Sequence, residues 1–316
     1  MCYFGNLLTG KTKLLHNHTS QIAEELDSVK GHVPRLLWHY KFTEPTSEIR
    51  EALGVSEPKR GSRVLYILVF PKLQPITDLQ GADFFNVLKQ CILCTWFVVH
   101  TYLFVELVWV AGHYDLWQAG VHHRDVSPAN LMWYRKGSVL MGVLNDYDLS
   151  SLATSVQGPQ GNQRTGTIPF MAVDLLTQRG EEVQHLYRHD LESFMWVLVW
   201  VALRYKNGRL LPRKNRPFDD WVAVDAKACG GKKLLFRDNI HDYAPFAKDE
   251  RIWGLIVGCF HVLHTESVRR EGVSIEQQQL WPEGGRQIVT EKIELDDHEF
   301  LDLFMATMAW VQLSLE

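Results

Sequence analysis

Apolar residues gather in short runs over the first quarter of the chain. Residues 33–40 and 63–70 are rich in aliphatic and aromatic side chains and are bounded by Pro or Gly, which predicts two strands. Over residues 20–29 the apolar positions recur on one helical face, and Ser20 can cap that helix. This part of the chain therefore predicts a small sheet with one helix.

The pattern after this first part is mostly that of helices. The exception is a predicted hairpin, with strands at residues 131–134 and 139–144 that are joined by a turn containing Gly. We therefore expect an α+β chain of two lobes. Residues 1–73 form a small β-rich lobe, and residues 74–316 form a larger lobe that is mainly helical.

Two apolar runs raise the question of a membrane span. Residues 91–111 are long enough, but Glu106 costs roughly 2.5–3.5 kcal/mol at a bilayer centre, and aromatic residues lie inside the run instead of at its ends. We expect a buried helix here, with a membrane span as the alternative. Residues 194–203 are too few to span and predict a core helix.

Composition and charge limit the class of protein. Hydrophobic residues make up 46% of the 316 residues, and 33 Lys and Arg against 37 Asp and Glu give a net charge of −4. No global positive field exists, so we expect neither nucleic acid nor a membrane as a partner. Five cysteines without repeated spacing and no signal peptide favour an intracellular protein, cytoplasmic or nuclear.

A polar loop between two apolar segments holds the residues that can carry chemistry. Asp125 is followed five residues later by Asn130, and Asp146 stands at the end of the predicted hairpin. The carboxylate of Asp125 can accept a proton from an attacking hydroxyl. The oxygens of Asn130 and Asp146 can bind a hard cation such as Mg²⁺, and phosphate oxygens would complete its coordination shell.

The order and spacing of these residues are specific. His123-Arg124-Asp125, then Asn130, then Asp146 resemble the catalytic loop and the metal-binding motif of the protein kinase superfamily. Further matching motifs are Asp146-Tyr147-Asp148-Leu149, Arg164-Thr165-Gly166-Thr167-Ile168-Pro169 and His189-Asp190-Leu191-Glu192-Ser193. Together they are similar to the fungal-type protein kinases, over roughly residues 20–260.

The resemblance implies a fold, cofactors and residue roles. It implies the two-lobe kinase fold, ATP and Mg²⁺ as cofactors, and a protein as substrate. By resemblance Asp125 is the catalytic base, Asn130 and Asp146 are metal ligands, and Arg124 pairs with a phosphate on the activation segment.

The activation segment would run from residue 146 to about residue 174. By resemblance Thr167 shapes the peptide-binding turn and contacts the catalytic loop. The alternative is that Thr167, Thr165, Thr154 or Ser155 carries a phosphate, which would order the segment through Arg124. Asp174 would end the segment, and Asp190 would brace the catalytic loop from within the apolar helix. We expect the roles of Asp174 and Asp190 to be structural.

The N-terminal lobe matches less well. A kinase holds the nucleotide phosphates with a lysine that pairs with a helical glutamate. Lys11 or Lys13 can supply the lysine, and Glu24 or its neighbour Glu25 the glutamate. No glycine-rich loop precedes them.

Three functions follow from these observations. The leading one is ATP-dependent phosphoryl transfer to a Ser or Thr hydroxyl of a protein. The alternative is a pseudokinase that acts as a protein-binding scaffold, because the glycine-rich loop is missing. A kinase of small molecules shares the Asp and Asn, but Arg124 and the Thr-Gly-Thr segment argue against it. Ser127, where most Ser/Thr kinases have lysine, leaves the peptide class open.

One charged segment lies outside these motifs. It can hold a phosphate or an acidic peptide, and a solvated loop is the other interpretation. Its basic residues are Arg204, Lys206, Arg209, Arg213, Lys214 and Arg216.

Overall fold

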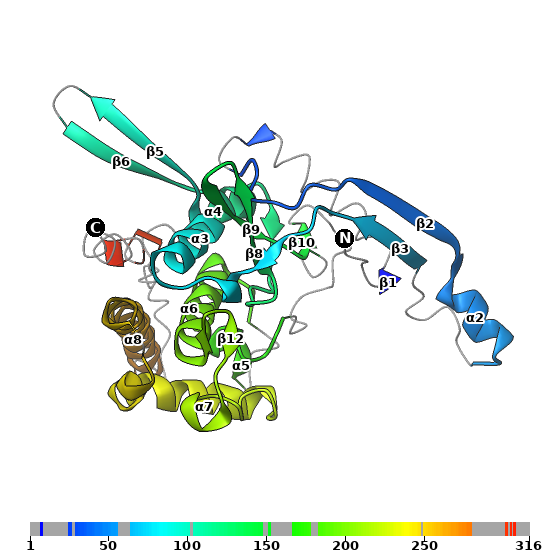
Figure 1. Cartoon of the computed structure of the whole chain (residues 1–316). Coiled ribbons are helices and arrows are strands. Elements are labelled where there is room, and N and C mark those ends of the chain that lie inside the picture. The colour runs from blue at the N-terminus through cyan, green and yellow to red at the C-terminus, as the bar shows by residue number, and fades with distance from the viewer. Residues whose placement is uncertain are drawn as a thin grey trace. The chain divides into compact units, whose positions relative to one another are not determined.

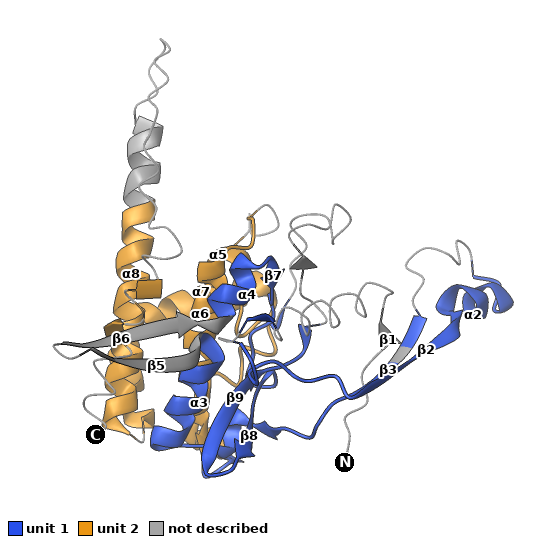
Figure 2. Cartoon of the chain, turned by 90° about the horizontal axis from the view of Figure 1, so that it is seen from above, with its two compact units in different colours: residues 1–167, 207–209 blue, residues 168–206, 210–316 orange. Residues whose placement is uncertain are grey.

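The structure is a computed structural model of the whole chain (Figure 1). It describes residues 7–8, 25–26, 29–55, 64–101, 104–147, 151–152, 166–177, 183–247, 249–279, 301–302, 304 and 306–307. The chain divides into two compact units, which Figure 2 shows in different colours. Unit 1 is residues 1–167 with 207–209, and unit 2 is residues 168–206 with 210–316. The lobe boundary expected after residue 73 stays a prediction.

Helices and small sheets alternate along the chain, which confirms the α+β class. The first sheet of unit 1 has the strand order β1-β3-β2 and is antiparallel. Its elements are β1 (Leu7–Leu8), β2 (Trp38–Pro45) and β3 (Val64–Val69), and α2 (Thr46–Ala52) follows β2. The predicted strand at residues 63–70 is confirmed. The other strand begins later than expected, because the chain turns at Gly31, where φ is +90°, and Pro34 has no N–H to donate.

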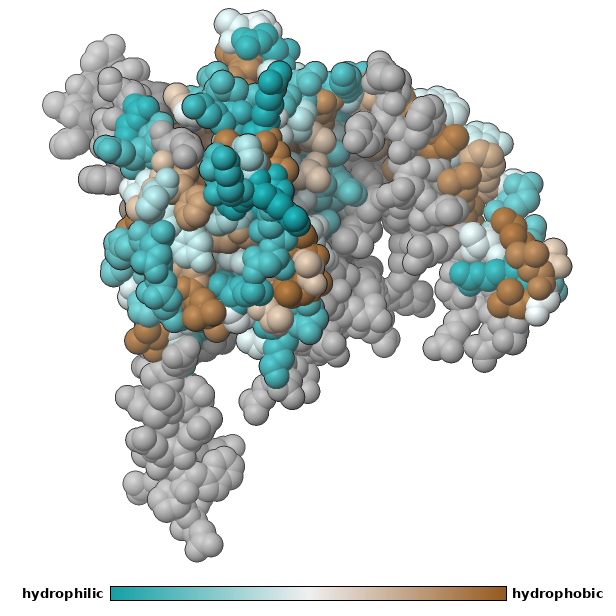
Figure 3. Space-filling view, turned by 60° about the horizontal axis from the view of Figure 1, so that its bottom comes forward, coloured by the Kyte–Doolittle hydropathy of each residue, from teal (hydrophilic) through white to brown (hydrophobic). Residues whose placement is uncertain are grey.

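The first sheet of unit 1 has a small core. Leu68 is its buried residue, and Leu36, Val64 and Phe70 pack against it. Large apolar side chains are exposed on β2 and α2, which Figure 3 shows at the right of the view. They are Leu37, Trp38, Tyr40, Ile49, Leu53 and Val55. The predicted helix over residues 20–29 falls largely outside the described residues.

The second sheet of unit 1 contains the hairpin that the sequence predicts. It has the strand order β4-β8-β9, with β4 (Gln74–Pro75), β8 (Leu131–Lys136) and β9 (Val139–Leu144). Between β4 and β8 lie η1 (Ile76–Asp78), α3 (Gly81–Leu93) and α4 (Gly112–Gln118). The register pairs Leu131 with Leu144, so the two ends of the hairpin lie side by side.

The packing of α3 on β9 depends on one glycine. A Cβ atom at Gly142 would lie 2.6 Å from the carbonyl oxygen of Val87, which no side chain tolerates. Gln90 of α3 bridges to β9, because its Nε2 donates to Leu140 O (3.0 Å) and its Oε1 accepts from Gly142 N (2.8 Å). The hairpin is therefore fixed against the helix by polar bonds as well as by apolar contact.

The prediction of one buried helix over residues 91–111 is wrong, because only residues 91–93 are helical, as the last residues of α3. The backbone forms an antiparallel pair, β5 (Cys94–Thr101) and β6 (Phe104–Ala111), between α3 and α4. Its β-branched and aromatic residues favour strands, and length alone does not separate a buried helix from two consecutive strands. Among the helices that the structure describes, none has the length and apolar content that crossing a bilayer requires.

Unit 2 is built around one buried helix, α6 (Tyr187–Arg204), which confirms the core helix expected at residues 194–203. Trp196 of α6 packs edge to face on Phe236 and Phe260, with ring centroids 5.8 and 4.7 Å apart. The other elements of unit 2 are α5 (Val173–Leu176), β11 (Tyr205–Lys206), η3 (Arg213–Asn215), α7 (Ala226–Asp238), η4 (Ile240–Phe246) and α8 (Glu250–Gln279). The short strands β7 (Val121–His122) and β10 (Ser151–Leu152) belong to unit 1, and β12 (Arg209–Leu210) has one residue in each unit.

Ionisable groups that are buried or half-buried join α5, α6 and α8. Asp174 of α5 accepts from Arg270 of α8, and its Oδ2 lies 3.7 Å from His189 Nε2. Burial acts to raise the pKa of the Asp174 carboxyl, but His189 and the charge of Arg270 hold it well below its usual range. His189 is 1% exposed, and burial lowers its pKa to about 4. The imidazole is therefore neutral in the folded state above that pH.

His189 makes the stability of unit 2 depend on pH. Between the folded-state pKa of about 4 and the usual histidine pKa of 6.5, the unfolded chain binds a proton that the folded chain does not. The free energy of unfolding should therefore fall as the pH drops from 6.5 to 4, by at most about 3 kcal/mol. Urea unfolding at several pH values measures this, and His189→Gln should flatten the dependence. The control is His241→Gln, at an exposed histidine. Equal pH dependence in the wild type and His189→Gln would contradict the assignment.

Candidate active site

The candidate site lies on the loop between β7 and β8. The helix α4 ends at Gln118, and the chain then turns at Gly120, where φ is +84°, a conformation that favours glycine. Trp117 of α4 then stacks on His122 of β7, with ring centroids 3.7 Å apart. The loop that follows is fixed at its start by this contact and at its end by the first residue of β8, Leu131, which is fully buried.

His123 joins the loop to the end of the hairpin. It is fully buried, and its ring meets that of Tyr147 edge to face at 4.7 Å. Asp125 N donates to His123 Nδ1 (3.3 Å), so Nδ1 is the acceptor and Nε2 carries the proton that is donated to Asn145 O (2.9 Å). His123 is a residue of the site that the motif alone does not reveal, because its ring links the backbone of Asp125 to that of Asn145, the residue before Asp146.

The carboxylate of Asp125 is held from two sides. Its Oδ1 accepts hydrogen bonds from Thr167 N (2.8 Å) and Thr167 Oγ1 (2.9 Å). Its Oδ2 accepts from Asn130 Nδ2 (3.3 Å). The contact expected between Thr167 and the catalytic loop is thereby confirmed. A carboxylate has about four acceptor positions, so these three bonds orient the group and leave room for one more donor.

Asn130 is positioned by its own backbone and by Asp125. Its N–H donates to Ser127 O (3.0 Å), its carbonyl accepts from Asn145 N (2.8 Å), and its Nδ2 also donates to Asp125 O (2.9 Å). Because the amide nitrogen is used in this way, the amide oxygen points to the other side of the group. That oxygen is the atom that can bind a cation.

Asp146 lies two residues after the end of the hairpin and is exposed. It has φ of 63°, and Arg124 in the loop has φ of 68°. Non-glycine residues in this left-handed region cost of order 1–3 kcal/mol each, and such strain gathers at functional sites. The strain at Arg124 and Asp146 therefore indicates a functional role for this region.

The structure brings some of the predicted residues together. Asp125, Asn130 and Thr167 are in contact, and Asp146 lies two residues beyond Leu144, the partner of Leu131 in the hairpin. The expected nucleotide residues Lys11, Lys13 and Glu24 lie outside the described residues, and their rival Glu25 is exposed.

The donor set suits magnesium. An amide oxygen from Asn130 and carboxylate oxygens from Asp146 are hard ligands, and Mg²⁺ takes one or two protein ligands with phosphate oxygens and water. In the described ranges no three His, Cys, Asp or Glu side chains gather where they could hold a metal alone. A metal here would therefore depend on phosphate oxygens for the rest of its shell.

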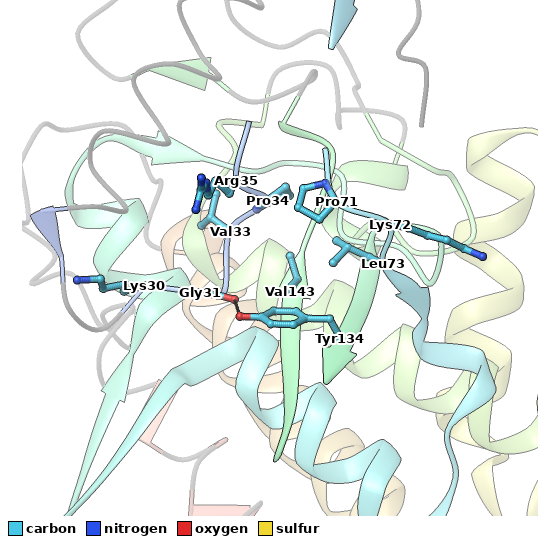
Figure 4. A pocket seen from close by; sticks show the side chains of 10 residues that line it. All are labelled: Lys30, Gly31, Val33, Pro34, Arg35, Pro71, Lys72, Leu73, Tyr134 and Val143. Atoms are coloured by element: carbon cyan, nitrogen blue, oxygen red, sulfur yellow. Dashed lines mark hydrogen bonds between the residues drawn. The ribbon is translucent and has the colours of Figure 1, made fainter. Parts of the chain in front are cut away.

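A pocket in unit 1 lies apart from these side chains. Its volume is about 540 Å³, within the range of small-molecule sites, and Asp125, Asn130 and Asp146 do not line it (Figure 4). Tyr134 and Val143 lie along one side, and the hydroxyl of Tyr134 donates to Gly31 O (3.3 Å). No sequence pattern indicates this pocket, because its walls come from residues 30–35, residues 71–73 and the hairpin of β8 and β9. The lining residues are Lys30, Gly31, Val33, Pro34, Arg35, Pro71, Lys72, Leu73, Tyr134 and Val143.

Comparison with known proteins points to the part of the chain that contains the candidate site. Residues 107–202 match a family model described as fungal protein kinase, and this segment contains Asp125, Asn130, Asp146 and Thr167. No curated protein matches the chain. The match indicates a kinase-like function for the segment. It confirms, over residues 107–202, the family that the motifs of the sequence indicate: the fungal protein kinases.

Proposed function

We propose that this chain transfers the γ-phosphoryl group of ATP to a Ser or Thr hydroxyl of a protein substrate. The observation that carries the proposal is the carboxylate of Asp125, which three hydrogen bonds orient inside a segment that matches the fungal protein kinases. A two-lobe kinase fold belongs to the same proposal.

Asp125 acts on the attacking hydroxyl. The fourth acceptor position of its carboxylate takes the hydroxyl proton as the substrate oxygen bonds to the γ-phosphorus and the bond to the leaving ADP oxygen breaks. Thr167 and Asn130 hold the carboxylate in place, so little orientation is left to be achieved when the substrate binds. The proton finishes on Asp125 and the phosphoryl group on the substrate oxygen.

Asn130 and Asp146 would hold Mg²⁺ on the phosphates of ATP. When bound, the ion neutralises negative charge on the transferring group. The amide of Asn130 serves both parts of the site, because its nitrogen bonds to Asp125 and its oxygen is left for the ion. Arg124, adjacent to Asp125, supplies a cation for a phosphate on the activation segment.

The scaffold alternative makes a different prediction about turnover. A pseudokinase keeps the folded segment and its contacts but releases no product. Separate measurements of Mg-ATP binding and of phosphoryl transfer therefore distinguish an active kinase from a scaffold.

Nucleotide binding is tested by thermal unfolding of the full chain with Mg-ATP. A ligand that binds only the folded state raises the free energy of unfolding, by about 2.7 kcal/mol at a ligand concentration of a hundred times Kd, and so raises the melting temperature. Asp146→Asn should lose most of this shift, because the amide that replaces the carboxylate has no charge to hold the ion. Asp115→Asn, a substitution of the same kind on α4, should keep it. An equal shift in wild type and Asp146→Asn would remove Asp146 from the ion site.

Transfer is tested with radiolabelled ATP and a general protein substrate. Asp125→Asn should lower kcat by roughly 10²-fold or more, because the proton acceptor is lost, while the Mg-ATP melting shift persists. Thr167→Ser, which keeps both donors, should stay near wild type, and Thr167→Val should lose part of the rate. Full transfer by Asp125→Asn would show that the base lies elsewhere, and no transfer by a wild type that binds Mg-ATP would favour the scaffold.

A further inference from the structure

Four of the six basic residues from 204 to 216 fall into two groups in the structure, and the other two, Lys206 and Arg209, are exposed. Arg204 and Arg216 pair with Asp219 in unit 2, and their side chains are 5% and 17% exposed. Arg213 and Lys214 belong to the short helical turn η3 and are exposed, Arg213 to 86% of its side chain. The first pair is structural, and the second pair faces solvent.

One carboxylate organises three guanidinium groups. Asp219 Oδ1 accepts from Arg204 Nη2 (2.8 Å) and Arg216 Nε (2.7 Å), and Asp219 Oδ2 accepts from Arg213 Nε (3.3 Å). A hydrogen bond from Arg216 is the main cause that holds the pKa of the Asp219 carboxyl well below its usual range. Three positive charges thus meet the single negative charge of Asp219, and the exposed Lys214 follows Arg213 in the chain. The excess of positive charge is built into the loop.

The loop that carries these groups is held rigidly. Arg204 donates to Pro217 O, and its guanidinium lies 3.9 Å from the centre of the Trp200 ring. Arg216 Nη1 donates to Leu211 O (2.6 Å), and Asn215 N donates to Pro212 O (2.8 Å). Prolines at 212 and 217 restrict the backbone further. A surface that is already ordered loses little entropy when a partner binds.

We propose that Arg213 and Lys214, on the loop ordered by Asp219, form a docking surface for a short acidic peptide segment of a protein partner. The guanidinium fork of Arg213 matches a carboxylate, and Lys214 adds a second cation one residue away. The net charge of −4 on the chain as a whole argues against a long polyanion, because a nucleic acid would meet repulsion outside this patch. The docking surface does not depend on phosphoryl transfer.

Fluorescence anisotropy of a labelled, glutamate-rich peptide with the full chain tests the proposal. The peptide should bind, and a peptide with Gln in place of each Glu should not. Binding should weaken as salt rises, because the pairs are exposed. Arg213→Glu should weaken it by about tenfold or more, which is about 1.4 kcal/mol, since one attraction becomes a repulsion. Arg213→Gln should have a smaller effect in the same direction.

The matched control is Lys227→Glu, an equal charge reversal at an exposed site on α7. It should leave peptide binding within about twofold of wild type. Thermal unfolding of Arg213→Glu should match wild type, because the side chain is exposed and its one ion pair is weak. The proposal is overturned if the acidic peptide does not bind, if Arg213→Glu binds it as well as wild type, or if labelled single-stranded DNA binds more tightly at the same salt.

Discussion

The orientation of one carboxylate is the constraint on which the rest of this site depends. Asp125 is held by both donors of Thr167 and by the amide of Asn130, and the same amide is thereby turned so that its oxygen can meet a cation. Removing any of these bonds would free the carboxylate to rotate. The proton acceptor and the ion ligand are therefore not independent residues but parts of one hydrogen-bonded unit.

The hairpin of β8 and β9 gives this unit its position. Asn130 precedes one strand and Asp146 follows the other, and bonds from Asn145 to Asn130 and from His123 to Asn145 close the two ends. Gly142 and Gln90 fix the hairpin on α3. This contact between helix and sheet also restricts the movement of the hairpin ends next to Asn130 and Asp146. The left-handed backbone at Arg124 and Asp146 persists because these surroundings determine it.

Much of this arrangement could be predicted from the sequence. The hairpin, the core helix α6 and the pairing of Thr167 with the catalytic loop follow from local patterns and from the motifs. The apolar run after Leu93 could not be assigned correctly, since aromatic and β-branched residues serve a buried helix and a strand pair alike. The division of basic residues into bound Arg204 and exposed Arg213 depends on Asp219, whose contacts no sequence pattern reveals.

The central claim is that Asn130 and Asp146 hold a divalent ion on ATP beside Asp125. Crystals of the full chain grown with ATP and Mn²⁺ test it most directly, because anomalous scattering locates the manganese. We expect a manganese peak that is bound by the amide oxygen of Asn130, a carboxylate oxygen of Asp146 and phosphate oxygens. Manganese-bound ATP at another place in the chain, with neither side chain in its shell, would contradict it.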